Sequence, residues 1–291
     1  MKMKNTTRKS IIGYSFIAIW IIGFLLFTLY PMITSIIYSL NYVQVTGTGI
    51  RLTFNGLKNY GTIFSTYGAN YLSALKSFAE GVLLRVLIIT VFSLIIALLL
   101  NQNVRFRGLF RTIFFLPVII SSGPVLKQLT SQGASGTSMM SSLTFVAAMA
   151  ASSNHFLSEI IAPLFSEIII VFWFSGVQIL LFLSSLQKMN KEIYEAAYID
   201  GAGPWEAFWK ITLPSLHSMI FISAIYSLVL LSTLGENGEN DVVREIRANM
   251  NSINTGYGVA SAMAWSYFLV LTAFLGIIAL LFLPRNKGGK K

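Results

Sequence analysis

The chain has 291 residues, of which 55% are hydrophobic and only 11% charged, and its formal net charge is +10. Soluble domains carry about 25% charged residues, so this composition excludes an ordinary soluble protein and favours an integral membrane protein. The absence of cysteine excludes disulfides, thiolate metal sites and cysteine nucleophiles. Basic residues flank the apolar segments instead of forming one patch, which argues against nucleic-acid binding.

Uncharged apolar segments predict an all-α protein with six membrane-spanning helices, because a span needs about 20 apolar residues. The spans are expected at about 12–39, 80–100, 111–130, 164–187, 214–235 and 259–283. Pro31 is expected to kink the first span, and Pro117 and Pro124 weaken the third. The segment 131–158 has too short an apolar core to span, so it is expected to form an outer-surface or re-entrant helix, with a seventh span as the alternative.

Charge placement predicts a multi-pass plasma-membrane protein with both termini in the cytoplasm. With six spans, the inner segments hold fourteen of the 21 Lys and Arg residues but only four acidic residues, so they carry the whole net charge of +10. Lys and Arg retained on the cytoplasmic side set the orientation of membrane proteins. A seventh span before residue 160 would reverse the later part of the chain, against this bias. The first apolar run is long and lacks a small-residue cleavage site, which favours an uncleaved span over a signal peptide.

The polar segment 188–213, here called the polar loop, lies between the fourth and fifth predicted spans and is expected to contain two short helices. Asn190 is a suitable N-cap, with Glu192 near the positive end of the helix dipole. Met189 and Tyr194 occupy the two positions of a hydrophobic staple. These signals predict that a helix begins directly after Asn190.

The first helix of the polar loop is predicted over about 191–200, ending at Gly201 and Gly203. Gly201 is expected to adopt positive φ. Pro204 suits the first turn of a second helix, over about 204–211. That helix would present the aromatic residues Trp205, Phe208 and Trp209, before Pro214 opens the fifth span.

The polar loop resembles the EAA loop of membrane permeases in ATP-binding-cassette (ABC) importers, and its Ile-Asp-Gly-Ala wording and aromatics resemble the maltose-type, carbohydrate branch. The resemblance implies that nine residues dock into a cleft of an ATPase subunit. These residues, which also carry the resemblance, are Glu195, Ala196, Ala197, Asp200, Gly201, Ala202, Ile211, Leu213 and Pro214. The alternative is a plain interfacial loop held by its tryptophans at the lipid surface. Glu195 is not expected to be a catalytic acid, because no second carboxylate, metal cluster or nucleophile–base pair accompanies it.

Two weaker resemblances to the same permeases extend the match to about residues 10–284, with gaps. Arg107-Gly-Leu-Phe-Arg-Thr-Ile-Phe-Phe-Leu-Pro117 resembles the segment that enters their third span, and Leu57-Lys-Asn-Tyr60 resembles their short outer motif after the first span. The segments 131–158 and 234–258 depart from the family wording. The chain has no G-x-x-x-x-G-K-[ST] sequence, so it is expected to bind no nucleotide, cofactor or metal and to have no enzymatic activity.

The resemblance implies an assembly of this chain with a second related permease, two ATPase subunits that bind ATP and Mg, and an extracellular solute-binding protein. It also implies that substrate passes between the two permeases, beside the fourth and fifth spans. Candidates for this path are Trp173, Gly176, Val177, Gln178, Tyr226 and Ser227, with Ser175 and Ser223 near them. Aromatic faces and hydrogen-bonding groups suit a sugar, but Ser, Gly and Gln are also ordinary helix-packing residues. Gln178 is the strongest candidate, because a buried amide in mid-membrane needs a partner.

The sequence therefore predicts one permease subunit of an importer that moves a sugar or oligosaccharide with energy from a partner's ATP hydrolysis. An importer permease for another polar solute, such as a glycerol phosphate, is the first alternative. A stand-alone secondary transporter or channel is the second, and it would place ionisable residues at mid-membrane, where the fourth and fifth spans offer none but His217. The sequence does not identify the sugar or its length. It also leaves open whether the two permeases form a homodimer or a heterodimer.

Overall fold

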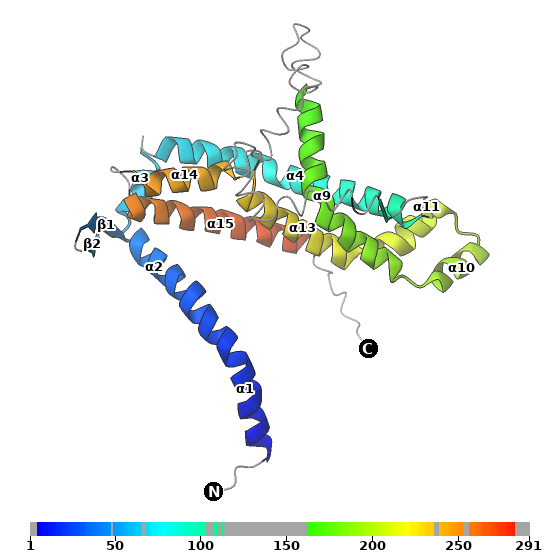
Figure 1. The fold of residues 1–291 in the computed structure, drawn as a ribbon. Helices are drawn as coiled ribbons and strands as arrows, with labels where there is room; N and C mark the ends of the chain where they lie inside the picture. The colour runs from blue at the N-terminus through cyan, green and yellow to red at the C-terminus, as the bar shows by residue number, and fades with distance from the viewer. Residues whose placement is uncertain are drawn as a thin grey trace, which may run out of the picture. The chain divides into compact units, whose positions relative to one another are not determined.

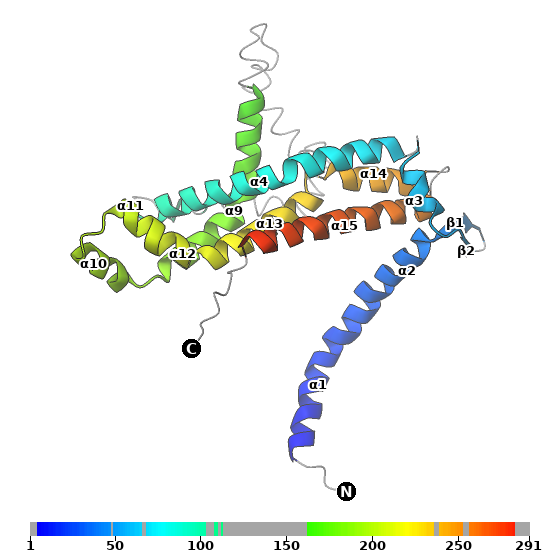
Figure 2. The same ribbon diagram turned by 180° about the vertical axis from the view of Figure 1, so that it is seen from behind.

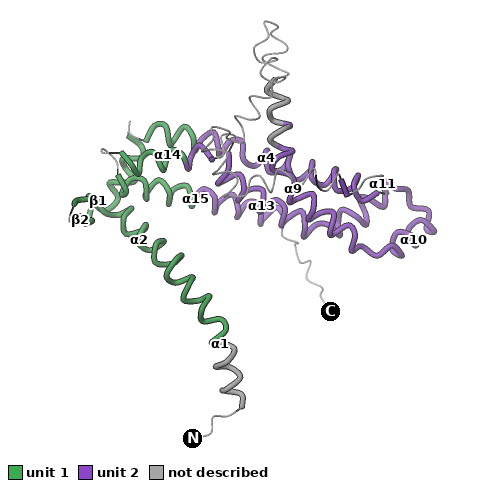
Figure 3. The backbone as a smooth tube through the Cα atoms, in the orientation of Figure 1, with its two compact units in different colours: residues 1–75, 244–269 green, residues 76–243, 270–291 purple. Residues whose placement is uncertain are grey.

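The computed structural model describes residues 5–47, 49–65, 68–102, 108, 109, 112, 162–235, 239–252 and 256–282. The described chain is mostly helical, as the sequence predicts (Figure 1). It divides into two compact units (Figure 3), the first with residues 1–75 and 244–269 and the second with residues 76–243 and 270–291.

Apolar helices long enough to cross a membrane account for much of the described chain. Three qualify by length and composition alone: Tyr14–Ser39, Ala69–Asn101 and Gly256–Phe282. Two bent pairs also qualify if each counts as one span: Val171–Gln187 with Lys191–Ile199, bent by 65°, and Pro204–Ser215 with His217–Thr233, bent by 63°. The predicted third span, 111–130, and the segment 131–158 lie outside the described residues, apart from Thr112.

The first unit begins with a long apolar helical segment. Its parts are α1 (Asn5–Phe24), a π-helical turn η1 (Leu25–Leu29) and α2 (Tyr30–Ser39). Pro31 lies in the first turn of α2, directly after the π turn. Because proline has no N–H to donate to the preceding turn, the altered hydrogen-bond spacing occurs where the sequence predicts a kink. Trp20 and Phe27 are about four-fifths exposed, as lipid-facing side chains of a span would be.

A β-hairpin follows α2, which the all-α prediction did not include. Strand β1 (Asn41–Thr46) pairs antiparallel with β2 (Gly49–Phe54). The short helix α3 (Lys58–Ile63) follows it. Gly49 has φ +129°, a conformation that side-chain-bearing residues rarely adopt, and it lies where the chain re-enters the sheet.

Helix α4 (Ala69–Asn101) begins well before the predicted start of the second span at residue 80. Its first turns are anchored inside the first unit by Tyr71, whose side chain is fully buried. The Tyr71 hydroxyl donates to the carbonyl of Met263 at 2.9 Å and lies 2.7 Å from Oγ of Ser266, both in α15 (Gly256–Phe282). Helix α14 (Asp241–Met250) precedes α15 along the chain and lies in the segment 234–258, whose sequence departs from the family pattern.

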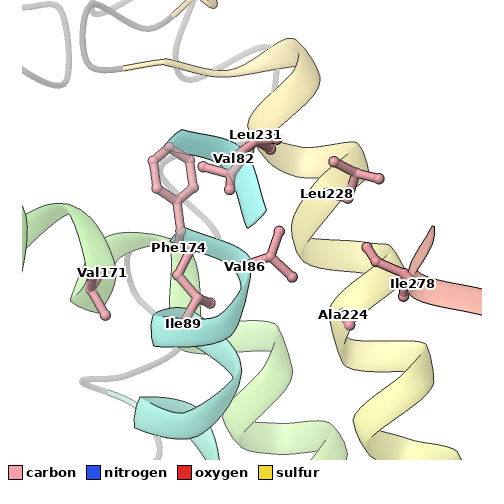
Figure 4. Close-up of a cluster of buried hydrophobic side chains, with 9 residues drawn as sticks. All are labelled: Val82, Val86, Ile89, Val171, Phe174, Ala224, Leu228, Leu231 and Ile278. Atoms are coloured by element: carbon pink, nitrogen blue, oxygen red, sulfur yellow. The ribbon is translucent and has the colours of Figure 1, made fainter. Parts of the chain in front are cut away.

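The second unit packs α4, α9 (Ala162–Gln187), α13 (His217–Thr233) and the end of α15 against one another. One buried cluster (Figure 4) joins all four helices and contains Val82, Val86, Ile89, Val171, Phe174, Ala224, Leu228, Leu231 and Ile278. A second cluster joins α4 and α9 to Leu216, which precedes α13. Such close packing stabilises helix association in a membrane, where lipid is as apolar as the core.

The polar loop belongs to the second unit and contains α10 (Lys191–Ile199), α11 (Pro204–Ala207), a π-helical turn η4 (Phe208–Thr212) and the start of α12 (Leu213–Ser215). Figures 1 and 2 show α10 and α11 beyond the ends of α9 and α13. The bends of 65° and 63° turn the short helices away from the axes of those two helices.

Candidate functional site

The N-terminus of α10 is closed by Asn190, as the sequence predicts. Asn190 has extended backbone, and its Oδ1 accepts a hydrogen bond from the N–H of Glu192 at 3.1 Å. Its Nδ2 donates to Oε2 of Glu192, also at 3.1 Å. The carboxylate of Glu192 therefore lies in the first turn, where the helix dipole favours negative charge.

The two staple residues, Met189 and Tyr194, meet as predicted, but the contact between them is partly polar. The Tyr194 hydroxyl donates to Sδ of Met189 at 3.6 Å. The same hydroxyl lies 2.8 Å from Oγ1 of Thr212, which is 6% exposed. This bond ties α10 to η4 across the polar loop. Sequence reasoning missed Thr212, since it occupies the variable position between Ile211 and Leu213 of the motif.

The C-terminus of α10 explains the spacing between the alanines and Gly201. Asp200 caps the helix, and Gly201 follows with φ +86°, which confirms the expected positive φ. The N–H of Gly201 donates to the carbonyl of Tyr198 at 3.1 Å, and that of Ala202 to Ala197 at 2.9 Å. These are the two bonds of a Schellman motif, with glycine at the left-handed position. No atom of the described residues lies within 4 Å of a Cβ added at Gly201, so backbone conformation is what requires glycine here.

The second half of the polar loop differs from the prediction in its boundaries. Pro204 lies in the first turn of α11, as predicted, but the helical path runs on through η4 and α12. The structure places Pro214 in the first turn of α12, before the bend, and the start of the fifth span at this proline stays a prediction. The chain then bends by 63°, and α13 begins at His217. Leu216, at the bend, is fully buried in the second core cluster, which holds the bend in place.

The aromatic residues of the polar loop form a cluster on its surface. Trp205 and Trp209 meet edge to face with ring centroids 5.6 Å apart, and Phe208 and Trp209 do so at 5.2 Å. Trp205 is 71% exposed. Beside them, Nζ of Lys210 lies 3.4 Å from Oε1 of Glu206 in an exposed ion pair, which contributes little to stability.

The nine predicted docking residues all lie in or beside the polar loop, and their surface is largely open. Glu195, Ala196, Asp200, Gly201 and Pro214 are exposed, whereas Ala197, Ala202, Ile211 and Leu213 are half-buried. Large apolar side chains accompany them, since Ile193, Tyr198 and Ile199 of α10 are each more than half exposed. Exposed apolar side chains beside small ones are typical of a surface that another protein covers. The role of these residues stays a prediction.

The structure brings together only part of the predicted substrate path. Gln178 of α9 is fully buried, and its Nε2 donates to Oγ of Ser227 in α13 at 2.9 Å. Ser227 in turn donates to the carbonyl of Ser223 at 2.9 Å. Among the described residues, neither Oε1 of Gln178 nor Oγ of Ser223 has a hydrogen-bond partner. These groups therefore form a closed polar contact between α9 and α13.

The other path candidates lie elsewhere on the same helices. Trp173 packs against the first core cluster of the second unit, and Ser175 is fully buried, with its carbonyl 3.4 Å from Oγ of Ser93 in α4. Gly176 is buried, whereas Val177 and Tyr226 are half-buried. Across the described residues, no three His, Asp or Glu side chains gather as metal ligands would.

Comparison with known proteins identifies the family. Residues 61–288 match the family described as "Binding-protein-dependent transport system inner membrane component". The chain belongs to this family. The protein is therefore a multi-pass membrane protein and the membrane component of a transport system, and the resemblance of its polar loop to importer permeases is confirmed.

Relatives and a solved structure of this permease family match nearly the whole chain. The "Probable ABC transporter permease protein YesP" of Bacillus subtilis (strain 168) is 30% identical over 97% of this chain and 92% of its own length. The "Multiple sugar-binding transport system permease protein MsmF" of Streptococcus mutans is 29% identical over 94% and 95%. A chain of a bacterial alginate ABC transporter, solved with an alginate pentasaccharide-bound periplasmic protein, aligns over 94% of each chain with a TM-score of 0.60 and 18% identity. The permease thus shares the fold of an ABC importer subunit.

Proposed function

We propose that this permease imports a sugar or an oligosaccharide as one subunit of an ABC importer. The observation that carries the proposal is the polar loop. Its two short helices are largely exposed and bent by more than 60° from the adjoining apolar helices, and a Schellman motif closes the first of them, α10. A carbohydrate substrate is supported by the relative named for multiple-sugar transport and by the structurally similar alginate transporter. Another polar solute, such as a glycerol phosphate, is the alternative.

The polar loop is proposed to couple ATP hydrolysis to movement of the apolar helices. Its exposed small residues allow close approach of another backbone, and Glu195 and Asp200 supply charge at the rim. The bond between Tyr194 and Thr212 supports this role, because it makes α10 and η4 move together. A push on α10 would therefore reach α9 directly and α13 through η4 and α12.

The proposed topology has six spans with both termini in the cytoplasm. Five of the spans correspond to the three long apolar helices and the two bent pairs, and 111–130 is proposed as the remaining one. The proposed orientation rests on the excess of Lys and Arg in the segments that would face the cytoplasm. It puts the polar loop on the cytoplasmic side, where ATP is available.

The proposed partners are a second related permease, two ATPase subunits that bind ATP and Mg, and an extracellular solute-binding protein. The family description supports the dependence on a binding protein. Gln178 is proposed to turn its unpartnered Oε1 toward a sugar hydroxyl when α9 and α13 separate. A buried carbonyl oxygen without a donor is costly, so a substrate hydroxyl that reached it would gain a strong contact.

Purification of the tagged chain from its native membrane tests the proposal. An ATPase and a second permease should co-purify, and ATPase activity in proteoliposomes should rise when a sugar-loaded binding protein is added. The chain alone should show no ATPase activity. Isolation of the chain without an ATPase, or transport driven by an ion gradient alone, would contradict the proposal.

A further inference from the structure

The hairpin of β1 and β2 has one apolar and one polar face. Residues that pair directly across an antiparallel sheet share a face, and the register pairs Val45 with Ile50 and Val43 with Leu52. Phe54 lies on the same face, opposite Asn41. We call Val45, Ile50, Leu52 and Phe54 the apolar face; they are 65%, 53%, 46% and 77% exposed. The other face carries Tyr42, Gln44, Thr53 and Arg51, the only charged residue of the two strands.

Contacts at the base of the hairpin hold it to the rest of the first unit. Val43 is buried, and the N–H of Asn55 donates to the carbonyl of Leu40 at 3.0 Å. An isolated two-stranded hairpin is at best marginally stable in water, and contiguous exposed apolar side chains mark a surface that something covers. The apolar face therefore needs a cover over most of its length.

The position of the hairpin along the chain indicates what that cover is. The apolar segment Tyr14–Ser39 has 26 residues, which at 1.5 Å per residue reach about 39 Å. A bilayer is about 30 Å thick in its hydrocarbon core and about 40–45 Å with its headgroups. The end of α2 thus falls within the headgroup layer, and only Leu40 separates α2 from β1. Exposed Ile33, Ile36 and Ile37 continue the apolar surface of α2 almost to the hairpin.

We propose that the apolar face of the hairpin lies on the phospholipids of the leaflet in which α2 ends, with Arg51 and Gln44 turned to water. A partner that docks and leaves would expose four large apolar side chains to water in each cycle, whereas lipid is always present. The complete separation of the charged residue from the apolar face also fits an element that lies flat in the interface. The hairpin would then anchor the end of the first span at a fixed depth.

Single-cysteine labelling tests this placement, because the chain has no cysteine of its own. Val45→Cys and Ile50→Cys probe the apolar face, and Gln44→Cys is the matched control on the opposite face. Ile22→Cys, at a 56% exposed position within α1, is the positive control for contact with lipid. Each variant carries a bimane fluorophore, in the whole transporter, in nanodiscs of phosphatidylcholine brominated near the headgroup or unbrominated.

Brominated lipid should quench the probes at Val45 and Ile50 at least about twice as strongly as the probe at Gln44, since only one face of an interfacial element meets the acyl chains. Iodide in the water should give the reverse order. Equal quenching of the two faces by iodide, with none by lipid, would overturn the proposal. Shielding of Ile50 from iodide only after the binding protein is added would overturn it too, and would identify a protein-docking face. These outcomes do not depend on which solute the transporter carries.

Discussion

Gly258 and Asn59 lie in such close contact that a Cβ on the glycine would be 3.0 Å from Nδ2 of the asparagine. Asn59 is 3% exposed, and its Nδ2 donates to the carbonyls of Ser39 and Asn41, both at 2.9 Å. The Leu57-Lys-Asn-Tyr60 motif therefore closes the end of α2 and fixes the start of the hairpin. The glycine allows α15 to approach this closure.

Replacement of Asn59 should destabilise the first unit. Asn59→Ala leaves two carbonyl groups near the end of α2 without a donor, which should cost about 1–3 kcal/mol. Asn55→Ala is the matched control, because Asn55 contacts the same group only through a 3.5 Å bond to Oδ1 of Asn59. The midpoint of thermal unfolding, measured on the purified protein in detergent, reports the stability of both variants. Equal midpoints for the two variants would show that Asn59 does not close the helix end.

Gly258→Ala should be destabilising although alanine is a better helix former than glycine. The added Cβ would lie 2.6 Å from the carbonyl oxygen of Asn41, a backbone atom that cannot move away cheaply. Gly276→Ala in the same helix meets no atom of the described part of the chain within 4 Å and should be neutral or stabilising by up to about 1 kcal/mol. The unfolding midpoint should therefore fall for Gly258→Ala and stay unchanged or rise for Gly276→Ala. An unchanged or raised midpoint for Gly258→Ala would refute the close contact.

Gly201→Ala should uncouple transport while leaving the apolar helices intact. Alanine at φ +86° costs about 1–2 kcal/mol, which strains the Schellman motif that shapes the polar loop. Gly201→Asp should act more strongly, because it adds a carboxylate next to Asp200. Gly203→Ala is the control, since Gly203 has extended backbone and equally open space. Uptake and ATPase co-purification, normalised to membrane expression, are the readouts.

Normal transport by Gly201→Asp at normal expression would make the docking role wrong and favour the interfacial-loop interpretation. Glu195→Ala should reduce uptake less than either Gly201 variant, because an exposed charge at the rim of a docking surface contributes only about 0–1 kcal/mol.

Mutation can distinguish a helix-packing role of Gln178 and Ser227 from the proposed contact of Gln178 with substrate. Gln178→Leu and Ser227→Ala each remove the bond between α9 and α13, so each should lower stability by about 0.6 kcal/mol, the mean for such bonds in membranes. Only Gln178→Leu removes the amide proposed to meet substrate, so only it should raise the KM for sugar-dependent ATPase activity. Identical kinetics in the two variants would leave Gln178 a packing residue.

Local signals made the polar loop predictable from sequence. An N-cap, a glycine at the end of a helix and a proline at the start of the next act within a few residues, so Asn190, Gly201 and Pro204 could be placed correctly. The hydrogen bonds between Tyr194 and Thr212 and between Gln178 and Ser227 could not be predicted, because the partners lie 18 and 49 residues apart. Only the packed fold brings these side chains together.

The hairpin and the start of α4 were missed for a different reason. Strand β1 and the first residues of β2 lie within the uncharged run 10–50 that contains the predicted first span, and their alternation is hidden among apolar neighbours. Lys76 and Glu80 lie at or before the predicted start of the second span, and in α4 they form an exposed ion pair at 3.8 Å on a helix that begins at Ala69. Apolar composition thus located the uncharged part of this helix but not its start at Ala69.

The π turn Leu25–Leu29 gives the first span a place where one residue can be lost without changing which way the helix faces. Such a turn holds one residue more than the α-helical ladder needs, and each residue of an α-helix turns the chain by about 100°. Deletion of one residue here would restore an unbroken α-helix and leave the segments before and after the turn facing as they do now. The same deletion elsewhere in the span has no extra residue to remove, so it would rotate one end of the helix by about 100° and change which side chains face lipid.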